Sequence, residues 1–369
     1  LSFNQLSRFD SVFLSPGARL DVPLSVEGED LKRIWKGGDF LERINSREKA
    51  ILGKETIVIG GGNTAMDVAR SALRLGSKVT VAYRRTRAEM PAIRDEIVEA
   101  EEEGVRLEFL IQPVKVSLLK NKRLGVKFQR MRLSDLDQSG RPRAIPLRGK
   151  SLTVETDRII TAVGEQVDLS WIPQELLEND LIDVNPSPTV FAGGDAVDQP
   201  RTIVTAISSG KRAAISIDLR LREDAHQEIS SKIRLGNKGS VSMEAYLSGR
   251  NEGRWPEPKD VISYDGINTL YFEHRQKINM RKLSLVQRRK SFSEVNRGLS
   301  SEGANLSASR CFSCGTCNYC YNCYFFCPEG AISLDPLHQT KYVDLDHCKG
   351  CGTCAKACPR SVVEMRDVP

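Results

Sequence analysis

A chain of 369 residues is long enough for two or three domains that each bury a core of their own. Hydrophobic residues make up 40% and charged residues 28% of the chain. No run of about 18 apolar residues occurs, which excludes an apolar membrane-spanning helix from the sequence. The net charge of +6 is too small to indicate a nucleic-acid partner unless the basic residues are concentrated in one place.

The first 50 residues have little regular pattern. Residues 9–14 form a short strand-like run that ends at Ser15-Pro16-Gly17-Ala18. A polar stretch follows as far as Gly53-Lys54, which is typical of a connector between two structured parts.

Residues 51–155 show the order strand, glycine turn, helix, strand, which is that of a βαβ unit. The two strands begin at Glu55 and Lys78, and the helix between them ends at Gly76. A second helix near residues 93–103 and several alternating strands complete the predicted domain.

The glycine turn of this unit has the spacing Gly60-x-Gly62-x-x-Ala65. Small residues at these positions let the backbone approach a pyrophosphate, which then lies at the N-terminus of the following helix. The motif alone is weak, but here it stands between a predicted strand and a predicted helix. We therefore predict that Gly60, Gly62, Asn63, Thr64 and Ala65 bind a dinucleotide.

The end of the second strand, about 20 residues further on, indicates which dinucleotide binds. An NAD- or FAD-binding domain places Asp or Glu there, whereas this chain has Arg84-Arg85-Thr86-Arg87. Guanidinium groups pair well with the 2′-phosphate of NADPH. The sequence favours NADPH over NADH, with Arg84 and Arg85 as phosphate ligands, unless these arginines are simply solvated.

Residues 156–221 contain two strand-like runs, at 158–163 and 189–191, and a helix near 202–221. The second run ends in Ala192-Gly193-Gly194-Asp195, which taken alone could be any turn.

Residues 222–309 have a weak apolar pattern with recurrent proline and glycine, which predicts an extended, mostly surface linker. Within it, the segment from Tyr271 to Arg297 carries eight basic and two acidic residues and so has a charge of +6 by itself. Such a stretch is either a solvated face or a docking site for an acidic partner, and both interpretations stay open. We expect no nucleic-acid partner and no membrane span.

Residues 310–369 contain all ten cysteines, so the thiols form a local cluster rather than a secreted disulfide framework. Two copies of C-x₂-C-x₂-C-x₃-C-P begin at Cys317 and Cys348, an offset of 31 residues. In this spacing three thiolates hold one 4Fe–4S cluster and the fourth reaches across to the other cluster. The predicted ligands are Cys317, Cys320, Cys323 and Cys358 for one cluster, and Cys348, Cys351, Cys354 and Cys327 for the other.

Two alternatives concern these cysteines. Structural zinc needs two pairs of thiolates separated by a longer loop, which fits the dense spacing poorly. Cys311 and Cys314 lie outside both motifs, and they are either free buried thiols or ligands of a further metal site completed from outside this chain.

The nucleotide-binding segments resemble the small-subunit family of NADPH-dependent glutamate synthase, over residues 9 to about 220. The resemblance rests on Gly60-Gly61-Gly62-Asn63-Thr64-Ala65-Met66-Asp67, Tyr83-Arg84-Arg85, Glu89-Met90-Pro91-Ala92, Glu102-Glu103-Gly104-Val105 and Val190-Phe191-Ala192-Gly193-Gly194-Asp195. The C-terminal domain departs from the glutamate synthase subunit. It is similar to relatives that feed electrons into other complexes, such as the flavoprotein that accompanies dissimilatory sulfite reductase.

The resemblance implies an α/β fold with two Rossmann-like dinucleotide-binding domains, the FAD one incomplete, and a C-terminal α+β dicluster ferredoxin domain. The implied domains are 1–50 (end of the first FAD-domain half and connector), 51–155 (NADPH), 156–221 (second FAD-domain half), 222–309 (linker) and 310–369 (clusters). It also implies that Gly194, Asp195 and the helix beginning at Thr202 bind the ribityl and flavin end of FAD.

One part of the family pattern is absent. The first GxGxxG and its ribose-binding acid, which hold the ADP half of FAD, do not occur in this sequence. We expect a further segment or chain to supply that half, and we expect the strand at Ser11 to Leu14 to pair with it.

The function that the resemblance implies is electron transfer. Hydride passes between NADPH and the flavin, which splits the pair into single electrons for the two clusters, so we name no catalytic side chain. We expect a partner redox subunit or ferredoxin, and a cytoplasmic location. A thioredoxin-reductase-like enzyme is excluded because residues 1–310 contain no cysteine, whereas a non-catalytic electron relay with a degenerate flavin site stays open.

Overall fold

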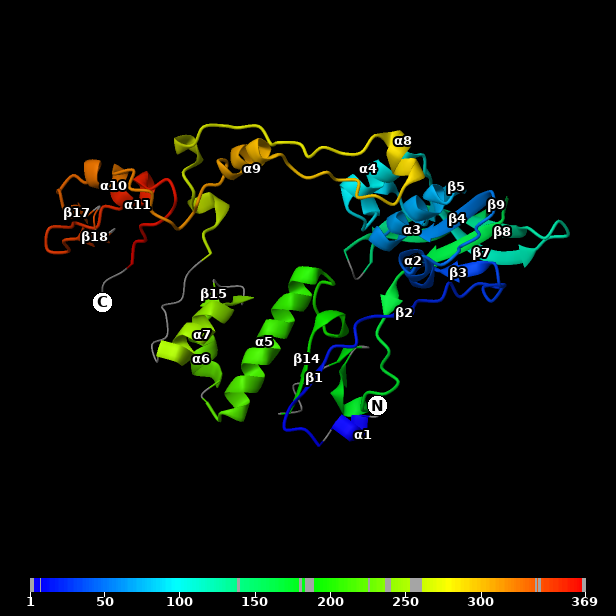
Figure 1. Ribbon diagram of the computed structural model, residues 1–369, viewed down its shortest axis with the longest axis horizontal. Helices are drawn as coiled ribbons and strands as arrows, with labels where there is room; N and C mark the ends of the chain where they lie inside the picture. The colour runs from blue at the N-terminus through cyan, green and yellow to red at the C-terminus, as the bar shows by residue number, and fades with distance from the viewer. Residues whose placement is uncertain are drawn as a thin grey trace. The chain divides into compact units, whose positions relative to one another are not determined.

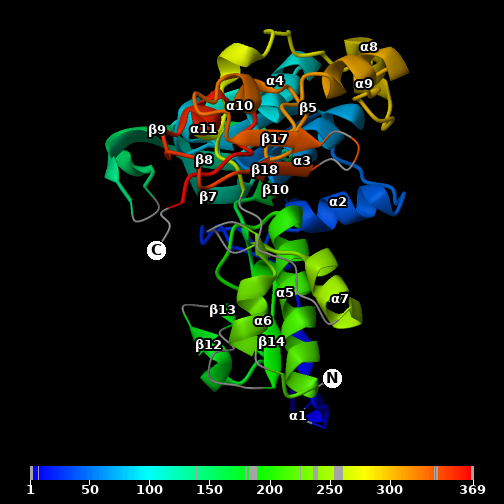
Figure 2. The ribbon, with the colours of Figure 1, turned by 90° about the vertical axis from the view of Figure 1, so that its left-hand side faces the viewer.

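The computed structural model describes residues 3–6, 8–137, 140–178, 181–182, 189–224, 226–235, 240–252, 261–335, 337 and 340–366. The chain divides into two compact units, residues 1–209 with 282–297 and residues 210–281 with 298–369. Figure 1 shows their helices and strands along the chain, and Figure 2 shows the same ribbon turned by 90° about the vertical axis.

The first unit is built on a parallel sheet of five strands in the order β3-β10-β4-β5-β6. The strands are Ile34–Lys36 (β3), Arg158–Ala162 (β10), Glu55–Gly60 (β4), Lys78–Tyr83 (β5) and Arg106–Phe109 (β6). β5 lies on one side of β4 and β10 on the other, so the winding of the sheet reverses at β4. Open parallel sheets bind ligands outside the carboxyl ends of the strands at this point.

Three helices cover one face of this sheet, namely α2 (Gly37–Asn45), α3 (Asn63–Arg74) and α4 (Arg94–Glu103). Their apolar side chains share one core with Val58 and Val81 of the sheet. The prediction of a strand, a glycine turn, a helix and a second strand is therefore confirmed, with boundaries close to those expected.

The other face of the sheet packs against three antiparallel strands, β7 (Ile111–Leu118), β8 (Leu124–Leu136) and β9 (Pro142–Thr156). Ile57 and Ile59 alternate with Val58 along β4 and point to this second layer, where they meet Val126 and Phe128. Burial on both faces explains why β4 is apolar throughout.

A smaller part of the first unit contains the strands predicted near residues 9–14 and 189–191. β1 (Val12–Leu14) and β14 (Val190–Ala192) form a parallel pair. Two short antiparallel pairs accompany them, β2 (Leu20–Asp21) with β11 (Glu165–Gln166) and β12 (Leu177–Glu178) with β13 (Leu181–Ile182). Helix α1 (Phe3–Leu6) and the beginning of α5 (Ile203–Leu221) belong to the same part. Pairing of residues 11–14 with a strand from outside this sequence stays a prediction.

The segment expected to be an extended linker contains regular structure. It forms α6 (His226–Lys232), β15 (Arg234–Leu235), β16 (Ser240–Val241), α7 (Met243–Glu252), α8 (Leu285–Lys290) and α9 (Ser301–Ala308). Ile229, Ile233 and Tyr246 pack against Leu219 of α5, so sparse apolar residues suffice for a small core. Residues 282–297 of the basic stretch belong to the first unit. This part of the stretch is therefore part of a folded unit and not of an extended linker.

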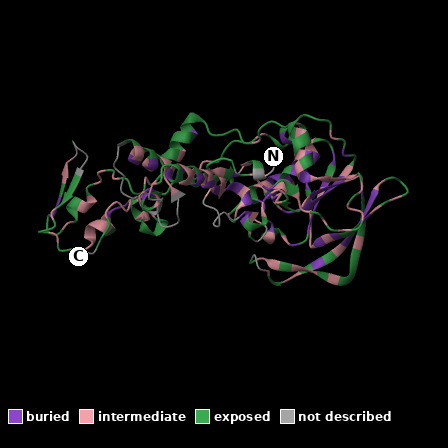
Figure 3. Ribbon diagram, turned by 90° about the horizontal axis from the view of Figure 1, so that it is seen from below, coloured by how far each residue is buried: buried purple, intermediate pink, exposed green. Residues whose placement is uncertain are grey.

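The cysteine-rich part has a short antiparallel hairpin and two short helices, and it lies within the second unit. The elements are α10 (Asn322–Phe325), β17 (Ile332–Asp335), β18 (Thr340–Val343) and α11 (Thr353–Ala357). Figure 3 shows buried residues concentrated in the strands of the first unit and few of them in this part. In the described part of the chain, no helix has the length and apolar character needed to cross a membrane.

Candidate functional site

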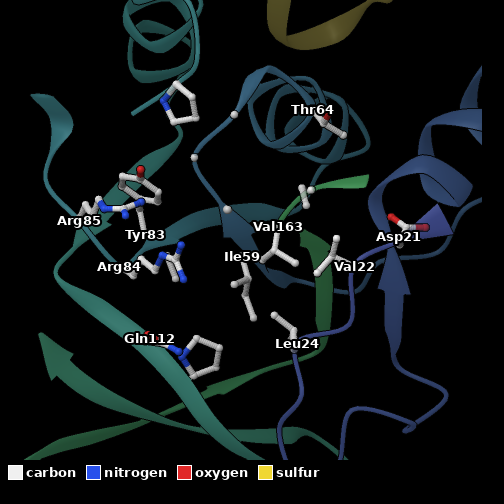
Figure 4. Close-up of a pocket in the computed structure, with 18 of the residues that line it drawn as sticks. Asp21, Val22, Leu24, Ile59, Thr64, Tyr83, Arg84, Arg85, Gln112 and Val163 are labelled. Atoms are coloured by element: carbon white, nitrogen blue, oxygen red, sulfur yellow. The ribbon is translucent and has the colours of Figure 1, made fainter. Parts of the chain in front are cut away.

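A cavity of about 460 Å³ lies at the carboxyl ends of β10, β4 and β5. Figure 4 shows Arg84 and Arg85 on one side of it and Asp21 on the other, with Ile59 and Val163 between them. Of the residues predicted to bind NADPH, the wall includes Gly60, Gly62, Thr64, Arg84 and Arg85. It also includes residues that the motif spacing does not indicate, namely Gly61, Tyr83, Arg141, Val163, Glu165 and Arg201.

The glycine turn brings its backbone very close to the neighbouring strands. Gly60 has φ +147°, and a Cβ atom on it would lie 2.1 Å from the carbonyl oxygen of Ala162. A Cβ atom on Gly61 would lie 2.5 Å from the ring of Tyr83. Gly62 has extended backbone and room for a Cβ atom, with its nearest neighbour 4.0 Å away. The motif spacing singled out Gly60 and Gly62 but missed Gly61, because the ring of Tyr83 comes from the next strand.

The remaining residues of the predicted turn have different positions. Thr64 lines the cavity, whereas Ala65 is fully buried under the turn. The side-chain oxygen of Asn63 accepts a hydrogen bond of 2.8 Å from the backbone N–H of Ile93. Asn63 therefore ties the loop before α4 to the start of α3, beside the cavity.

The two predicted phosphate ligands differ in their surroundings. Arg84 is exposed at the cavity wall. Arg85 is buried, and it donates a 2.7 Å hydrogen bond to the carbonyl of Pro142 and pairs at 2.5 Å with the carboxylate of Asp137. The guanidinium of Arg85 thus holds the β8–β9 hairpin, which carries a further arginine of the cavity wall, Arg141.

The opposite end of the cavity is acidic. Asp21 of β2 stands directly opposite Glu165 of β11, and both line the cavity. Burial and the nearby charge of Asp39 raise the pKa of Asp21 above its ordinary value. Burial and the charge of Asp21 raise the pKa of Glu165. Sequence reasoning missed this pair, because the two residues are brought together only by the β2–β11 pairing.

The predicted flavin residues follow β14. The N–H of Gly194, which has φ +72°, donates a 2.8 Å hydrogen bond to the hydroxyl of Ser209 on α5. Asp195 is half-buried in the short turn Gly194–Ala196. The hydroxyl of Thr202 accepts a hydrogen bond of 3.1 Å from the N–H of Thr205 and so caps the start of α5.

The eight predicted cysteine ligands surround two small cavities, four around each. One cavity is lined by Cys317, Cys320, Cys323 and Cys358, and the other by Cys327, Cys348, Cys351 and Cys354. This is the same division that the crossed spacing predicts. Four thiols around each cavity are the donor set that a 4Fe–4S cluster takes.

The fourth cysteine of each motif is held in the same way. The sulfur of Cys327 accepts a 3.3 Å hydrogen bond from the N–H of Ala331, and that of Cys358 a 3.2 Å bond from the N–H of Val362. Backbone N–H groups directed at ligand sulfurs are one of the means by which a protein sets the potential of such clusters.

Cys311 and Cys314 are both exposed, so the interpretation of them as buried thiols is wrong. Hydrogen bonds from the N–H and the hydroxyl of Ser313 lower the pKa of Cys311. Neither residue belongs to the wall of the two cysteine-lined cavities.

Comparison with protein families gives two matches. The family described as pyridine nucleotide-disulphide oxidoreductase matches residues 4–210, and the 4Fe-4S dicluster domain matches residues 316–363. Together with the observed sheet, these matches confirm the predicted α/β fold class with a dicluster domain at the C-terminal end. They also confirm the predicted cofactor classes, a nicotinamide–flavin pair and two 4Fe–4S clusters.

Three curated relatives are similar to this chain. The NADP(+)-dependent formate dehydrogenase subunit beta of Moorella thermoacetica is 35% identical over 327 residues, which cover 85% of this chain and 44% of that protein. The NADPH-Fe(3+) oxidoreductase subunit beta of Geobacter sulfurreducens is 41% identical over 251 residues, covering 58% and 37%. The glutamate synthase [NADPH] small chain of Escherichia coli is 33% identical over 238 residues, covering 58% and 50%. The chain thus spans half or less of the length of these relatives.

Proposed function

This chain belongs to the pyridine nucleotide-disulphide oxidoreductase family, and we propose that it carries electrons between NADPH, FAD and two 4Fe–4S clusters for a partner redox subunit or ferredoxin. The proposal rests on one observation: the same chain has a cavity lined by the glycine turn and by arginines, and two further cavities lined by four cysteines each. The predicted relationship to the glutamate synthase small chain is confirmed at 33% identity.

In this proposal the pyrophosphate of NADPH lies on the turn Gly60-Gly61-Gly62, which lines the cavity at the N-terminus of α3. Arg84 then contacts the 2′-phosphate. Arg141 lines the same wall and is suited to a second contact, while Arg85 positions it by holding the β8–β9 hairpin.

The proposed flavin site lies at Gly194, Asp195 and the start of α5. The N-terminus of this 19-residue helix supplies a partial positive charge, and Ile203, Val204 and Ile207 on its first turns are 81%, 76% and 59% exposed. An exposed apolar surface beside a polar turn suits the flat ring and the ribityl chain of a flavin. When bound, the flavin supplies the exchange between hydride and single electrons.

In the proposed cluster sites, Cys317, Cys320, Cys323 and Cys358 hold one cluster, and Cys327, Cys348, Cys351 and Cys354 hold the other. Ligation requires thiolates in a reducing compartment, for which we propose the cytoplasm. The curated relatives named above are subunits or chains of larger enzymes by their names, so we propose that this chain also works with a partner subunit.

The test is an anaerobic preparation of the whole chain with measurement of iron, sulfide and flavin, followed by addition of NADPH. We expect eight irons per chain and bleaching of the cluster absorption on addition of NADPH and FAD. Full iron content with no reduction by NADPH would instead indicate a non-catalytic electron relay. Zinc in place of iron would refute the cluster assignment.

A further inference from the structure

The order of the strands decides which end of the cavity takes which half of the nucleotide. The glycine turn after β4 is the proposed pyrophosphate site, and Arg84 after β5 is the proposed 2′-phosphate ligand. The nicotinamide half must extend in the opposite direction, toward β10 on the other side of β4.

The wall at that end is formed by the last residue of β10 and the residues that follow it. Ala162, Val163 and Gly164 line the cavity, and Val163 is 41% exposed. Val22, the residue after β2, faces them, with a methyl group 3.8 Å from the position that a Cβ atom on Gly164 would take. These small and apolar residues offer a surface on which a flat ring can lie.

Two carboxyl groups flank this apolar surface. Asp21 and Glu165 are directly opposite in the antiparallel β2–β11 pair. Residues in such positions point to the same face, with Cβ atoms about 5 Å apart, and like charges there destabilise the pair. The carboxylate pair is therefore a local cost to the fold, and a positively charged ligand would offset it.

Other charged groups surround the pair from several elements. Asp21 faces Asp39 and Lys36, and it accepts a hydrogen bond from the N–H of Gly38 at the start of α2. Burial and the charge of Asp39 raise the pKa of Asp21, and they outweigh Lys36 and the hydrogen bond, which lower it.

Glu165 faces Asp21, Arg201 and Asp195. The guanidinium of Arg201 donates a 2.6 Å hydrogen bond to the backbone carbonyl of Glu165 rather than to its carboxylate. Burial, with Asp21 and Asp195, raises the pKa of Glu165 against the opposing charge of Arg201. Since Asp195 is a proposed flavin ligand, this end of the cavity is also the end within electrostatic reach of the proposed flavin site.

We propose that Asp21 and Glu165 lie beside the nicotinamide ring and favour NADP⁺ over NADPH by attracting the positive charge of the oxidised ring. The inference rests on the proposed nucleotide site. The ring is neutral in NADPH and becomes a cation when hydride, a proton with two electrons, leaves its C4 atom for the flavin. A negative pair next to the ring therefore makes release of hydride more favourable.

The test is the ratio of the dissociation constants of NADP⁺ and NADPH, measured by calorimetry on the anaerobic whole chain. Both nucleotides carry the same phosphates, so the ratio isolates the charge of the ring. In the double variant Asp21→Asn with Glu165→Gln, we expect NADP⁺ to bind about fivefold more weakly, the size of a screened ion pair. The affinity for NADPH should stay within about twofold.

The matched control is Asp168→Asn, which removes a carboxylate three residues from Glu165 and outside the cavity wall. It should leave the ratio unchanged. An unchanged ratio in the double variant, or equal weakening of both nucleotides, would overturn the inference while leaving the proposed function intact. Wild-type protein that binds neither nucleotide would overturn both.

The dependence of the ratio on pH gives a second readout. The pair attracts the cation only when ionised, so the preference for NADP⁺ should grow as the pH rises through the raised pKa values of Asp21 and Glu165. The double variant should show a flat ratio over the same range. A ratio that changes with pH equally in both proteins would assign the effect to other groups and count against the inference.

Discussion

Gly60 and Gly62 stand in the same turn but differ in what a side chain would meet. A methyl group on Gly60 would collide with the carbonyl of Ala162 in a backbone conformation that favours glycine, whereas one on Gly62 would meet nothing closer than 4.0 Å. Gly60 therefore serves the fold of the turn. Gly62, at the N-terminal boundary of α3, is better placed to affect the ligand.

Replacing each of these glycines by alanine separates the two roles. We expect Gly60→Ala to lower the free energy of unfolding by about 1–3 kcal/mol, the usual cost of a strained backbone position. Gly62→Ala should leave the thermal midpoint almost unchanged while weakening NADPH binding. Equal loss of stability in the two variants would contradict this account of the turn.

Arg84 and Arg85 are adjacent in sequence but make different contacts, and only the structure separates them. We expect Arg84→Ala to weaken NADPH binding by about 1.5–3 kcal/mol, the range of a hydrogen bond to a charged group, and to leave NADH binding unchanged. Arg85→Ala should mainly reduce stability, because it leaves the Asp137 carboxylate without this partner. Binding titrations with both nucleotides and thermal unfolding of both variants check this. Equal effects on NADPH and NADH would refute the assignment of Arg84.

The difference between the two arginines marks a limit of sequence reasoning at this scale. The pattern after β5 predicts that guanidinium groups gather near the cavity, and both arginines do line it. The ion-pair partner of Arg85 is Asp137, which lies 52 residues further along the chain. No local sequence pattern therefore shows which of the two guanidinium groups is already paired with a carboxylate.

At the scale of elements, helix α8 and its flanks pack onto α4 through charged contacts. Lys282 pairs with Glu99 at 2.7 Å, and the nearly buried guanidinium of Arg288 pairs with Glu102 at 3.0 Å. Burial alone would raise the pKa of Glu99, but the hydrogen bond from Lys282 and the neighbouring cations outweigh it and hold the pKa below its ordinary value of 4.5.

This contact should weaken in acid. A carboxyl group whose pKa is lowered by folding stabilises the folded state above its unfolded pKa, and the contribution is lost as the pH falls through the folded value. We therefore expect protease susceptibility within residues 282–297, and hydrogen exchange there relative to the intrinsic rate at each pH, to increase below about pH 4.5. Lys282→Ala should increase both already at pH 7, whereas Lys290→Ala, at an exposed position on α8, should not. Equal protection in all three proteins would show that the charged contact does not hold the segment.

Periodicity predicts the elements that are long and amphipathic, such as α3 and α5, close to their observed ends. It does not predict α6 and α7, because their few apolar residues are buried only by contact with each other and with α5. Nor does it predict α8, because the packing of residues 282–297 depends on the acidic side chains of α4. The β2–β11 pair is two residues long on each strand and leaves no pattern in the sequence.

At the scale of the molecule, the two cysteine motifs depend on each other. Each cavity draws three cysteines from one motif and one from the other, so neither motif completes a donor set by itself. The repeat with its fixed spacing made this arrangement predictable from the sequence, because the spacing of ligands is set by cluster chemistry rather than by packing.

Crossed ligation gives a sharp prediction for two serine variants of the whole chain. Cys358 belongs to the second motif in sequence but lines the cavity of the first, so Cys358→Ser should disturb the cluster held by Cys317, Cys320 and Cys323. Cys354→Ser should disturb the other cluster. In each case we expect iron to fall from about eight toward four per chain, the content of one cluster, with the loss of one of two electron paramagnetic resonance signals in the reduced protein.

Cys358→Ser combined with Cys317→Ser should lose the same signal as either change alone, because both sulfurs then belong to one cluster. If Cys358→Ser and Cys354→Ser removed the same signal, each motif would bind its own cluster and the crossed arrangement would be wrong.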